Sequence, residues 1–354
     1  MKEKTLWLNQ IKGLCICLVV FYHSVITFYP HLSSFQHPWS GTLAKCWVYF
    51  NLYLAPFRMP VFFFISGFLI QRYIDGVSWR DSLGKRVGNI LWVLVLWGIL
   101  QWQALSHITQ WLAPDRVVNT SANAAYAGSF SEFAQAMLTA STSLWYLYAL
   151  IAYFVLCKLT SRGKTLMITG LALLSIAINF LPTPWWGMNS VLRNVIYYAL
   201  GAWYGTALMA WMMAFDVRRR WLPLGVLAFF AVGLWFARTP LFLSLLSIFV
   251  IMKVFYAVGR RFPPSDRSLL NVVGSNTIAI YTTHRILVEI FSLLLIGWFS
   301  AQARSPSLEF AILLFYPFFS LLLCVATGML ARSLSQRLAG DIFFSPPSIA
   351  SSRP

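Results

Sequence analysis

Apolar runs long enough to cross a bilayer recur from one end of this chain to the other, and they constrain its fold more than any other feature. A membrane-spanning helix needs about 20 mostly apolar residues. Hydrophobic residues make up 59% of the 354 positions and charged residues only 10%, whereas soluble domains usually contain about 25% charged residues. We therefore predict an all-α, polytopic transmembrane helical bundle of about ten spans. The predicted spans are 11–29, 46–70, 87–105, 143–159, 165–181, 190–214, 222–237, 240–258, 272–299 and 308–331.

Short basic or proline-rich segments separate these runs, and no internal repeat divides the chain. We expect one membrane-embedded domain over residues 1–340, followed by a short cytoplasmic tail at 341–354. The longest gap, residues 106–142, has aromatic and apolar side chains at helical intervals from Tyr126 to Met137. This pattern predicts an interfacial helix in the gap.

The formal net charge of +17 follows the predicted topology. With the N-terminus in the cytoplasm, most Lys and Arg residues fall on cytoplasmic segments, such as the run Arg218–Arg220. Such an excess on alternate short loops is the positive-inside rule, so both termini are predicted to be cytoplasmic. Nucleic acid is not needed to explain the basic excess. The remaining share of the basic excess is expected to serve anionic membrane lipids or an anionic cytosolic ligand.

Lys12 and His23 lie eleven residues apart in the first span, and a helix returns side chains at this spacing to nearly one face. The imidazole then lies about 16 Å deeper in the membrane than the ammonium group. His284 falls at a similar depth in the ninth span. A histidine can take a proton from a hydroxyl nucleophile, so both are catalytic candidates, although a single buried histidine is more often a packing residue.

Further basic side chains lie within the predicted spans. Arg193 and Lys253 are near span ends, where snorkelling to the interface explains them without a function. Arg58 is near mid-depth in the segment Pro56–Pro60, whose prolines free backbone carbonyls and kink the helix. Arg58 is therefore either a contact for an anion or oxyanion, or a structural counterion.

Arg285 and Glu289 are spaced i and i+4 in the ninth span, so they are predicted to pair on one helix face and neutralise each other. This pair is either structural or part of a site. The cysteines form no convergent Cys/His pattern, so we predict no metal site. The chain contains no Gly-x-Ser-x-Gly, P-loop, dinucleotide-binding or His-Glu-x-x-His motif, which disfavours hydrolases, ATPases and metalloproteases.

Four blocks of sequence stand out in chain order: Ile11–Ser24, Pro60–Phe68, Ser143–Leu147 and Gly274–His284. In this order they resemble the acyltransferase-3 family of bacterial integral membrane O-acyltransferases, whose opening helix has Arg-x10-His within a basic-Gly-apolar run. Members of that family move acyl groups, often acetyl from acetyl-CoA, onto hydroxyls of cell-envelope sugars. The resemblance implies an inner-membrane enzyme with no permanently bound cofactor, with acyl-CoA as cosubstrate and an envelope glycan or lipid as acceptor.

The resemblance also implies roles for individual residues. His23 would be the catalytic base or an acyl relay, and the basic residue at position 12 would help to hold acyl-CoA on the cytoplasmic side. The separation of about 16 Å along the helix approaches the reach of an extended pantetheine arm. The nucleotide phosphates would then lie among Lys12, Lys85 and Arg86. Other candidate site residues are Ser66, Trp145, Tyr281, Arg285 and Glu289.

Two positions depart from the family pattern. Lys12 replaces an arginine, and an ammonium group cannot reproduce the bidentate contact of a guanidinium with phosphate. The expected Arg-x-x-Arg appears as Arg86 followed by Asn89. These departures favour one alternative, a non-catalytic membrane protein of the same fold. The other alternative is a transporter or flippase, which typically has paired broken helices, but only one break, at Pro56–Pro60, is evident in the sequence.

Overall fold

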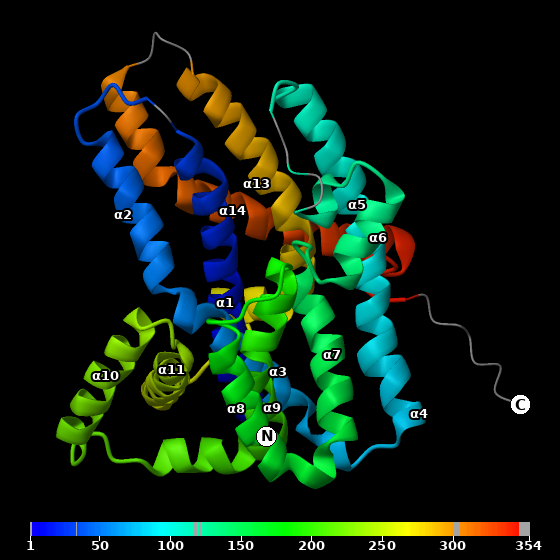
Figure 1. Ribbon diagram of the computed structural model, residues 1–354, viewed down its shortest axis with the longest axis vertical. Coiled ribbons are helices and arrows are strands. Elements are labelled where there is room, and N and C mark those ends of the chain that lie inside the picture. The colour runs from blue at the N-terminus through cyan, green and yellow to red at the C-terminus, as the bar shows by residue number, and fades with distance from the viewer. Residues whose placement is uncertain (1, 33, 117–118, 120–121, 301–304, 347–354) are drawn as a thin grey trace, which may run out of the picture.

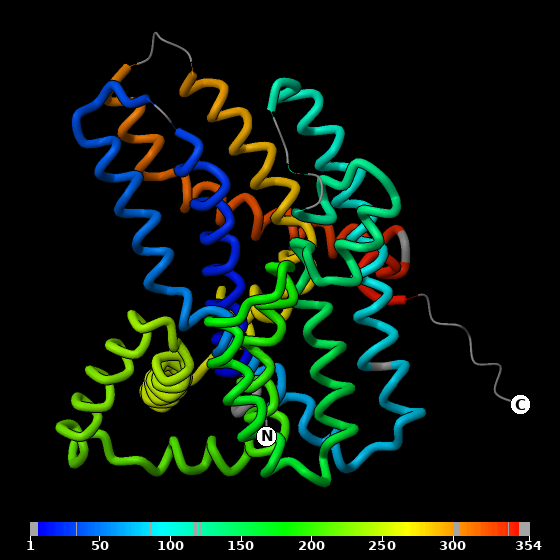
Figure 2. Tube along the Cα trace, viewed as in Figure 1, coloured from blue at the N-terminus to red at the C-terminus, as the bar shows by residue number. Residues whose placement is uncertain are grey.

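The protein is built from α-helices, and the computed structural model has no β-strand in the residues it describes, 2–32, 34–116, 119, 122–300 and 305–346 (Figures 1 and 2). The predicted all-α fold class is therefore confirmed. Short connecting helices join the longer ones. The α-helices are α1 (Lys2–Phe28), α2 (Ser40–Tyr53), α3 (Ala55–Asp75), α4 (Trp79–Ser82), α5 (Asn89–Leu112), α6 (Phe130–Leu138), α7 (Trp145–Leu159), α8 (Lys164–Ala177), α9 (Trp186–Ala214), α10 (Trp221–Phe236), α11 (Leu241–Arg261), α12 (Leu269–Ser275), α13 (Thr277–Ser300) and α14 (Pro306–Ala339). The short turns are the 3-10 helices η1 (Tyr29–His31), η3 (Ala124–Tyr126) and η4 (Ser161–Gly163), and the π-helix η2 (Leu83–Gly88).

Long apolar helices dominate the fold. In Figure 1, α1 passes through the middle of the bundle, between α2, α5 and α13 in the upper part of the view and α7 to α11 in the lower part. The prediction of about ten spans and of cytoplasmic termini stays a prediction. Within the described residues, six helical segments are long and apolar enough to cross a membrane: Leu6–His31, Ser40–Asp75, Trp79–Leu112, Leu241–Arg261, Thr277–Ser300 and Pro306–Leu338.

The second predicted span, 46–70, is broken between α2 and α3. Pro56 lies in the first turn of α3, where its missing N–H would have no partner within the helix. Pro60 lies inside α3 and removes one more backbone hydrogen bond. The break positions Arg58, in the first turn of α3, against the centre of the bundle, where its side chain is buried.

The ninth predicted span, 272–299, is also interrupted, although only the break at Pro56–Pro60 is evident in the sequence. α12 and α13 are separated at Asn276, whose side-chain amide donates to the Val272 carbonyl. No proline or glycine occupies this position, which is why the sequence pattern did not reveal it. The Asn276 break lies near the contact of Gly274 with Asn9 of α1, whereas the break before α3 borders the central cavity.

Two helix crossings depend on glycine. Gly13 of α1 and Gly274 of α12 face each other's helices, and a Cβ at either position would collide with a backbone carbonyl. Gly67 of α3 and Gly201 of α9 form a second crossing of the same kind. Three of these glycines lie in the sequence blocks that resemble the acyltransferase-3 family. These blocks therefore supply close helix packing in addition to polar groups.

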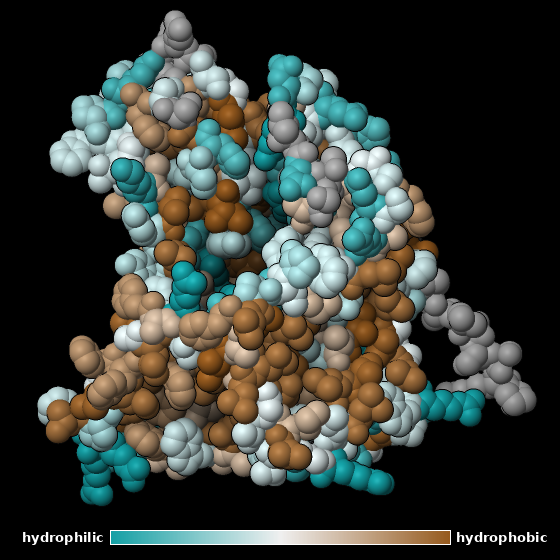
Figure 3. Space-filling model, in the orientation of Figure 1, coloured by the Kyte–Doolittle hydropathy of each residue, from teal (hydrophilic) through white to brown (hydrophobic). Residues whose placement is uncertain are grey.

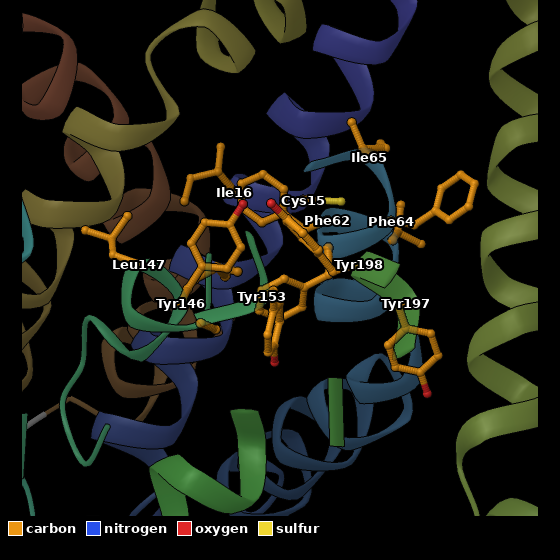
Figure 4. Close-up of a cluster of buried hydrophobic side chains, with 14 of the residues drawn as sticks. Cys15, Ile16, Phe62, Phe64, Ile65, Tyr146, Leu147, Tyr153, Tyr197 and Tyr198 are labelled. Carbon is orange, nitrogen blue, oxygen red and sulfur yellow. The ribbon is translucent and has the colours of Figure 1, made fainter. Parts of the chain in front are cut away.

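Aromatic side chains fill the core where α1, α3, α7 and α9 meet (Figure 4). Phe62 of α3 stacks on Tyr146 of α7, with 4.6 Å between the ring centroids. The hydroxyl of Tyr153 in α7 donates to the Val191 carbonyl of α9. Stacked rings and satisfied hydroxyls fix the relative positions of these helices, which carry most of the cavity wall.

The gap between α5 and α7 contains the helix α6, which begins later than the pattern from Tyr126 predicted, and its interfacial position stays a prediction. Ser129 caps its N-terminus by accepting a hydrogen bond from the Glu132 backbone N–H. Phe133 packs against Trp102 of α5, with 4.6 Å between ring centroids. Tyr126 does not belong to this helix, because it lies in η3 and its hydroxyl contacts the bundle interior.

After α14 the chain returns to α5. Trp92 and Trp97 of α5 donate their indole N–H groups to the carbonyls of Ile342 and Phe343, each at 2.7 Å. Phe344 stacks on Trp97, with 5.5 Å between the ring centroids. The end of the described chain is thus packed against α5.

Candidate functional site

A cavity of about 680 Å³ lies in the centre of the bundle. Residues of α1, α3, α9 and α13 form its wall, together with the segments that precede α6 and α7. Figure 3 shows a hollow with hydrophilic residues around it, above the hydrophobic band that crosses the lower part of the view. The cavity brings together five of the sequence candidates: His23, Arg58, Trp145, Tyr281 and Arg285.

His23 and His284 lie side by side although they come from α1 and α13, with 5.0 Å between their ring centroids. His23 lines the cavity, and His284 is fully buried next to it. The Nδ1 atom of His284 is 2.7 Å from the carbonyl oxygen of Tyr281. Since a carbonyl only accepts, Nδ1 carries the proton and Nε2 has the lone pair. Among the described residues, that Nε2 atom has no hydrogen-bond partner.

Arg58 is held at the cavity by α1 and α2. Its Nη1 atom donates to Asn51 Oδ1 at 2.9 Å, and its guanidinium carbon lies 4.1 Å from the ring centroid of Tyr22. Asn51 and Tyr22 orient the guanidinium without neutralising its charge. Arg58 therefore keeps a full positive charge and further donors for a bound group.

Glu289 pairs with two arginines. The predicted pair with Arg285 is present, with 2.8 Å between nitrogen and oxygen. Arg116, from the segment after α5, forms a second ion pair at 2.6 Å. The carboxylate is fully buried, so it needs such partners to remain charged. Arg285 also donates to the Tyr126 hydroxyl at 2.6 Å, and this network ties the segment between α5 and α7 to α13.

The donor-binding candidates do not line the cavity. The Nζ atom of Lys12 is 3.4 Å from Asn9 on its own helix. The guanidinium of Arg86 lies 4.1 Å from the ring centroid of Tyr73, near the C-terminal end of α3. The side chain of Lys85 lies outside the described residues. Because α1 rises about 1.5 Å per residue, Lys12 is about 16 Å from the histidine pair along the helix.

Hydrogen bonds join the second, third and fourth sequence blocks. The hydroxyls of Ser66 and Tyr146 are 2.8 Å apart, and the Tyr281 hydroxyl donates to the Ser143 carbonyl at 2.8 Å. Trp145 and Tyr281 also line the cavity, whereas Ser66 does not. The structure thus separates Ser66 from the other candidates in these blocks.

Lys253 and Arg193 were expected from their depth in the membrane to reach the interface. In the structure, both lie next to other parts of the protein. The Lys253 ammonium donates to the carbonyls of Met213 and Phe215, at 3.3 and 2.7 Å, and so satisfies the C-terminal end of α9. Arg193 lines the cavity. Lys253 thus has hydrogen-bond partners within the protein, and Arg193 faces the cavity.

Several residues of the cavity wall carry no clear signal in the sequence. Arg116 lies outside any apolar periodicity, and the helical intervals that begin at Tyr126 indicated an interfacial helix and not a contact with the cavity. The signal for Arg193 was present, because it belongs to a set of residues at helical intervals. We name this set the polar row of α9, and it consists of Trp186, Ser190, Arg193, Asn194 and Tyr197.

The described residues offer no evident site for a metal ion. Among the described residues, no group of three or more His, Cys, Asp and Glu side chains is placed to hold a metal ion. The free cysteines Cys15, Cys157 and Cys324 are buried within the helices. In the described part of the chain, the ionisable groups in and beside the cavity are histidines, arginines, tyrosines and the Glu289 carboxylate.

Comparison with known proteins adds to this geometry. A family model described as an acyltransferase domain matches residues 5–329. The chain belongs to the acyltransferase-3 family. It is also 61% identical, over 349 residues, to the inner membrane protein YcfT of Escherichia coli (strain K12), which covers 99% of this chain and 98% of that protein. No solved structure matches the chain.

The family match, the relative and the apolar helices together define the kind of protein this is. It is a multi-pass protein of the bacterial inner membrane, with an acyltransferase-3 domain that contains both histidines and the whole cavity wall. The segment that packs on α5 after α14 lies beyond the matched residues.

Proposed function

We propose that this protein is a membrane O-acyltransferase that moves an acyl group, expected to be acetyl, from acyl-CoA to a hydroxyl of an envelope sugar or lipid. One observation carries the proposal: His23 and His284 lie in contact at the wall of a polar cavity, in a chain of an acyltransferase family. In the orientation predicted from the basic loops, the cavity opens toward the outer leaflet. The acceptor enters from that side, and the donor binds from the cytoplasm.

His23 acts as the general base in this proposal. In the reacting state proposed here, the His23 ring N–H donates to Nε2 of His284, which has no partner in the described structure, and the other His23 nitrogen is free to take a proton. The acceptor hydroxyl gives its proton to that nitrogen while its oxygen attacks the thioester carbonyl carbon. The carbon–sulfur bond then breaks, and the CoA thiolate takes the proton from His23 as it leaves.

Cations at two depths support this reaction. Arg58, which lines the same cavity as His23, stabilises the oxyanion that forms on the thioester carbonyl. Lys12, Lys85 and Arg86 hold the nucleotide phosphates at the cytoplasmic end. The pantetheine arm spans the distance of about 16 Å along α1 between these two places. CoA is thus a cosubstrate that leaves after each turnover.

The decisive test is a reconstituted transfer assay that follows label from acetyl-CoA to envelope glycans. We expect His23→Ala to lower the transfer rate by about 10²- to 10⁴-fold, the usual contribution of a positioned acid or base. His107→Ala, which changes an exposed histidine of α5 outside the cavity, is the matched control and should retain full activity. Undiminished transfer by His23→Ala would exclude the proposed role.

His284 is a positioning residue, because it acts through His23. We expect His284→Gln to lower kcat by about tenfold and to leave KM for acetyl-CoA unchanged. A structural defect would instead lower the fraction of active protein without changing the kinetic constants per active site. Active-site titration separates these two outcomes.

Mass spectrometry of envelope glycans, from cells with and without the protein, separates the enzyme from its alternatives. An acyltransferase produces an acyl mass that disappears when the gene is removed. A transporter or a non-catalytic protein leaves the acyl content per glycan unchanged, and that result would overturn the proposal.

A further inference from the structure

The polar row of α9 forms one wall of the cavity, and the reaction proposed above does not use it. Two hydrogen bonds stay within the row: the Ser190 hydroxyl donates to the Trp186 carbonyl at 3.1 Å, and the Asn194 amide donates to the Ser190 carbonyl at 2.8 Å. In the described part of the chain, the amide oxygen of Asn194 has no donor. The row therefore presents a guanidinium, an amide oxygen and a hydroxyl to the cavity.

The arginines of the cavity differ in their partners. Arg116 and Arg285 both pair with Glu289, and Arg58 donates to a side-chain amide. The Nε atom of Arg193 is buried without a hydrogen-bond partner among the described residues. A buried N–H donor without a hydrogen bond costs free energy, and an acceptor atom of a ligand would recover that free energy.

The cavity also carries more positive than negative charge. Four guanidinium groups line it, from Arg58, Arg116, Arg193 and Arg285, and Glu289 is the one carboxylate among the described residues that pairs with any of them. Desolvated positive charge favours an anionic ligand. The phosphates of an acyl-CoA held at Lys12 and Arg86 would lie at the other end of the bundle, so they would not neutralise this excess.

Aromatic faces accompany the charged groups. Trp145, Trp186 and Trp235 all line the cavity, and Trp186 is anchored by its indole N–H, which donates to the Ala122 carbonyl at 2.6 Å. The C–H face of a sugar ring packs on such an indole, while its hydroxyls bond with amide and hydroxyl groups at the edge. Tryptophan faces next to hydrogen-bonding side chains therefore fit a saccharide.

We propose that the polar row of α9 binds the acceptor, and that the acceptor is an acidic saccharide whose carboxylate or phosphate pairs with Arg193. This inference rests on the proposed acyl transfer, because it assigns the cavity to the acceptor. The acidic group anchors one side of the sugar at α9, and a ring hydroxyl faces His23 on α1. A guanidinium suits both anions because its parallel N–H groups match their oxygens.

The acceptor proposal can be tested by measuring the binding of sugars to the purified protein, without any acyl donor. Isothermal titration compares three probes of one ring size: glucose, glucuronic acid and glucose 6-phosphate. Inorganic phosphate and phosphatidylglycerol vesicles are the controls for a free anion and a lipid headgroup. We expect at least one acidic sugar to bind about tenfold more tightly than glucose and than either control. Equal affinity for the neutral and acidic sugars, or phosphate as tight as the sugar phosphate, would overturn the proposal.

Variants at Arg193 locate the acidic group. Arg193→Gln should abolish the preference for the acidic sugar, and Arg193→Lys should keep part of it. Arg238→Gln removes the same charge at an exposed position outside the cavity, and it should leave the preference unchanged. Retained preference in Arg193→Gln would contradict the assignment. The Lys variant keeps the test valid if the Gln variant fails to fold.

The transfer assay with the same sugars separates the two proposals. Transfer to glucose at the same rate as to the acidic sugars would reject the acidic acceptor and keep the acyltransferase. Tight binding of an acidic sugar without transfer would reject the acyltransferase with acetyl-CoA and keep the site on α9.

Discussion

The charged groups at the cavity and the proposed donor-binding residues at the other end of the bundle are held in different ways. At the cavity, Arg285 and Glu289 of α13 are fixed by partners from other segments of the chain, and Arg58 is fixed by α1 and α2. At the other end, Lys12 contacts its own helix and Arg86 rests on an aromatic ring. Buried charges need prearranged partners, whereas groups near water do not. The difference suggests chemistry at the cavity and reversible binding of a charged cosubstrate at the other end.

The strongest test of this contrast is to remove the buried carboxylate. Glu289→Gln leaves Arg116 and Arg285 without their counterion, so we expect the free energy of unfolding to fall by about 3–5 kcal/mol. Denaturant unfolding in detergent measures the loss. Asp75→Asn removes an exposed carboxylate at the end of α3 and should cost no more than about 0.5 kcal/mol. Similar losses in both variants would remove the contrast between the two ends.

The next largest effect concerns the donor end. Lys12→Glu replaces attraction for the acyl-CoA phosphates by repulsion, so we expect acetyl-CoA to bind about a hundredfold more weakly. Lys12→Arg should bind it as tightly as the natural protein or more tightly, because a guanidinium contacts phosphate with two N–H groups. Calorimetric titration compares them. Equal binding by both variants would remove Lys12 from the donor site.

Tyr126 tests the link between the connecting segment and α13. Tyr126→Phe loses the hydrogen bond to Arg285, and we expect it to lower the free energy of unfolding by about 1.5 kcal/mol at neutral pH. Burial raises the pKa of Tyr126 from 10.0 to about 12. The raised pKa stabilises the fold fully below pH 10.0, and this contribution is lost as the pH rises through about 12.

The raised pKa of Tyr126 also predicts how the stability of Tyr126→Phe depends on pH. Unfolding measured between pH 10.0 and about 12 should show a steeper loss of stability for the natural protein than for the variant. Parallel curves for the two proteins would mean that the phenol is not buried in the folded state.

The smallest effect is expected at Ser66. Its hydroxyl bonds to Tyr146 outside the cavity, so Ser66→Ala should cost about 1 kcal/mol of stability and change the transfer rate by less than about twofold. The transfer assay and an unfolding curve measure the two quantities. A loss of transfer comparable to that of His23→Ala would return Ser66 to the site.

Much of the candidate site could be predicted because ionisable groups are costly in hydrocarbon and therefore stand out in an apolar sequence. His23, Arg58 and Arg285 were singled out on this basis and all line the cavity. The i and i+4 spacing also predicted the pair of Arg285 with Glu289. These predictions needed only depth and helical periodicity, which local sequence contains.

The remaining wall of the cavity depends on long-range contacts. Arg116 and Tyr126 reach the site because a connecting segment folds back onto α13, and no local pattern encodes that contact. Depth alone could not distinguish Arg193 as a cavity residue from an interfacial one. The break at Asn276 escaped notice because the residue is compatible with a helix and the interruption involves its own side chain.

The docking of Ile342 and Phe343 on α5 sets a rule for engineering this protein. A truncation before Ile342 would strip the acceptors from the indole N–H groups of Trp92 and Trp97. An affinity tag or fluorescent reporter joined directly there would compete with the same contact. Reporters used to map which side of the membrane each loop faces should therefore follow residue 346 through a flexible linker.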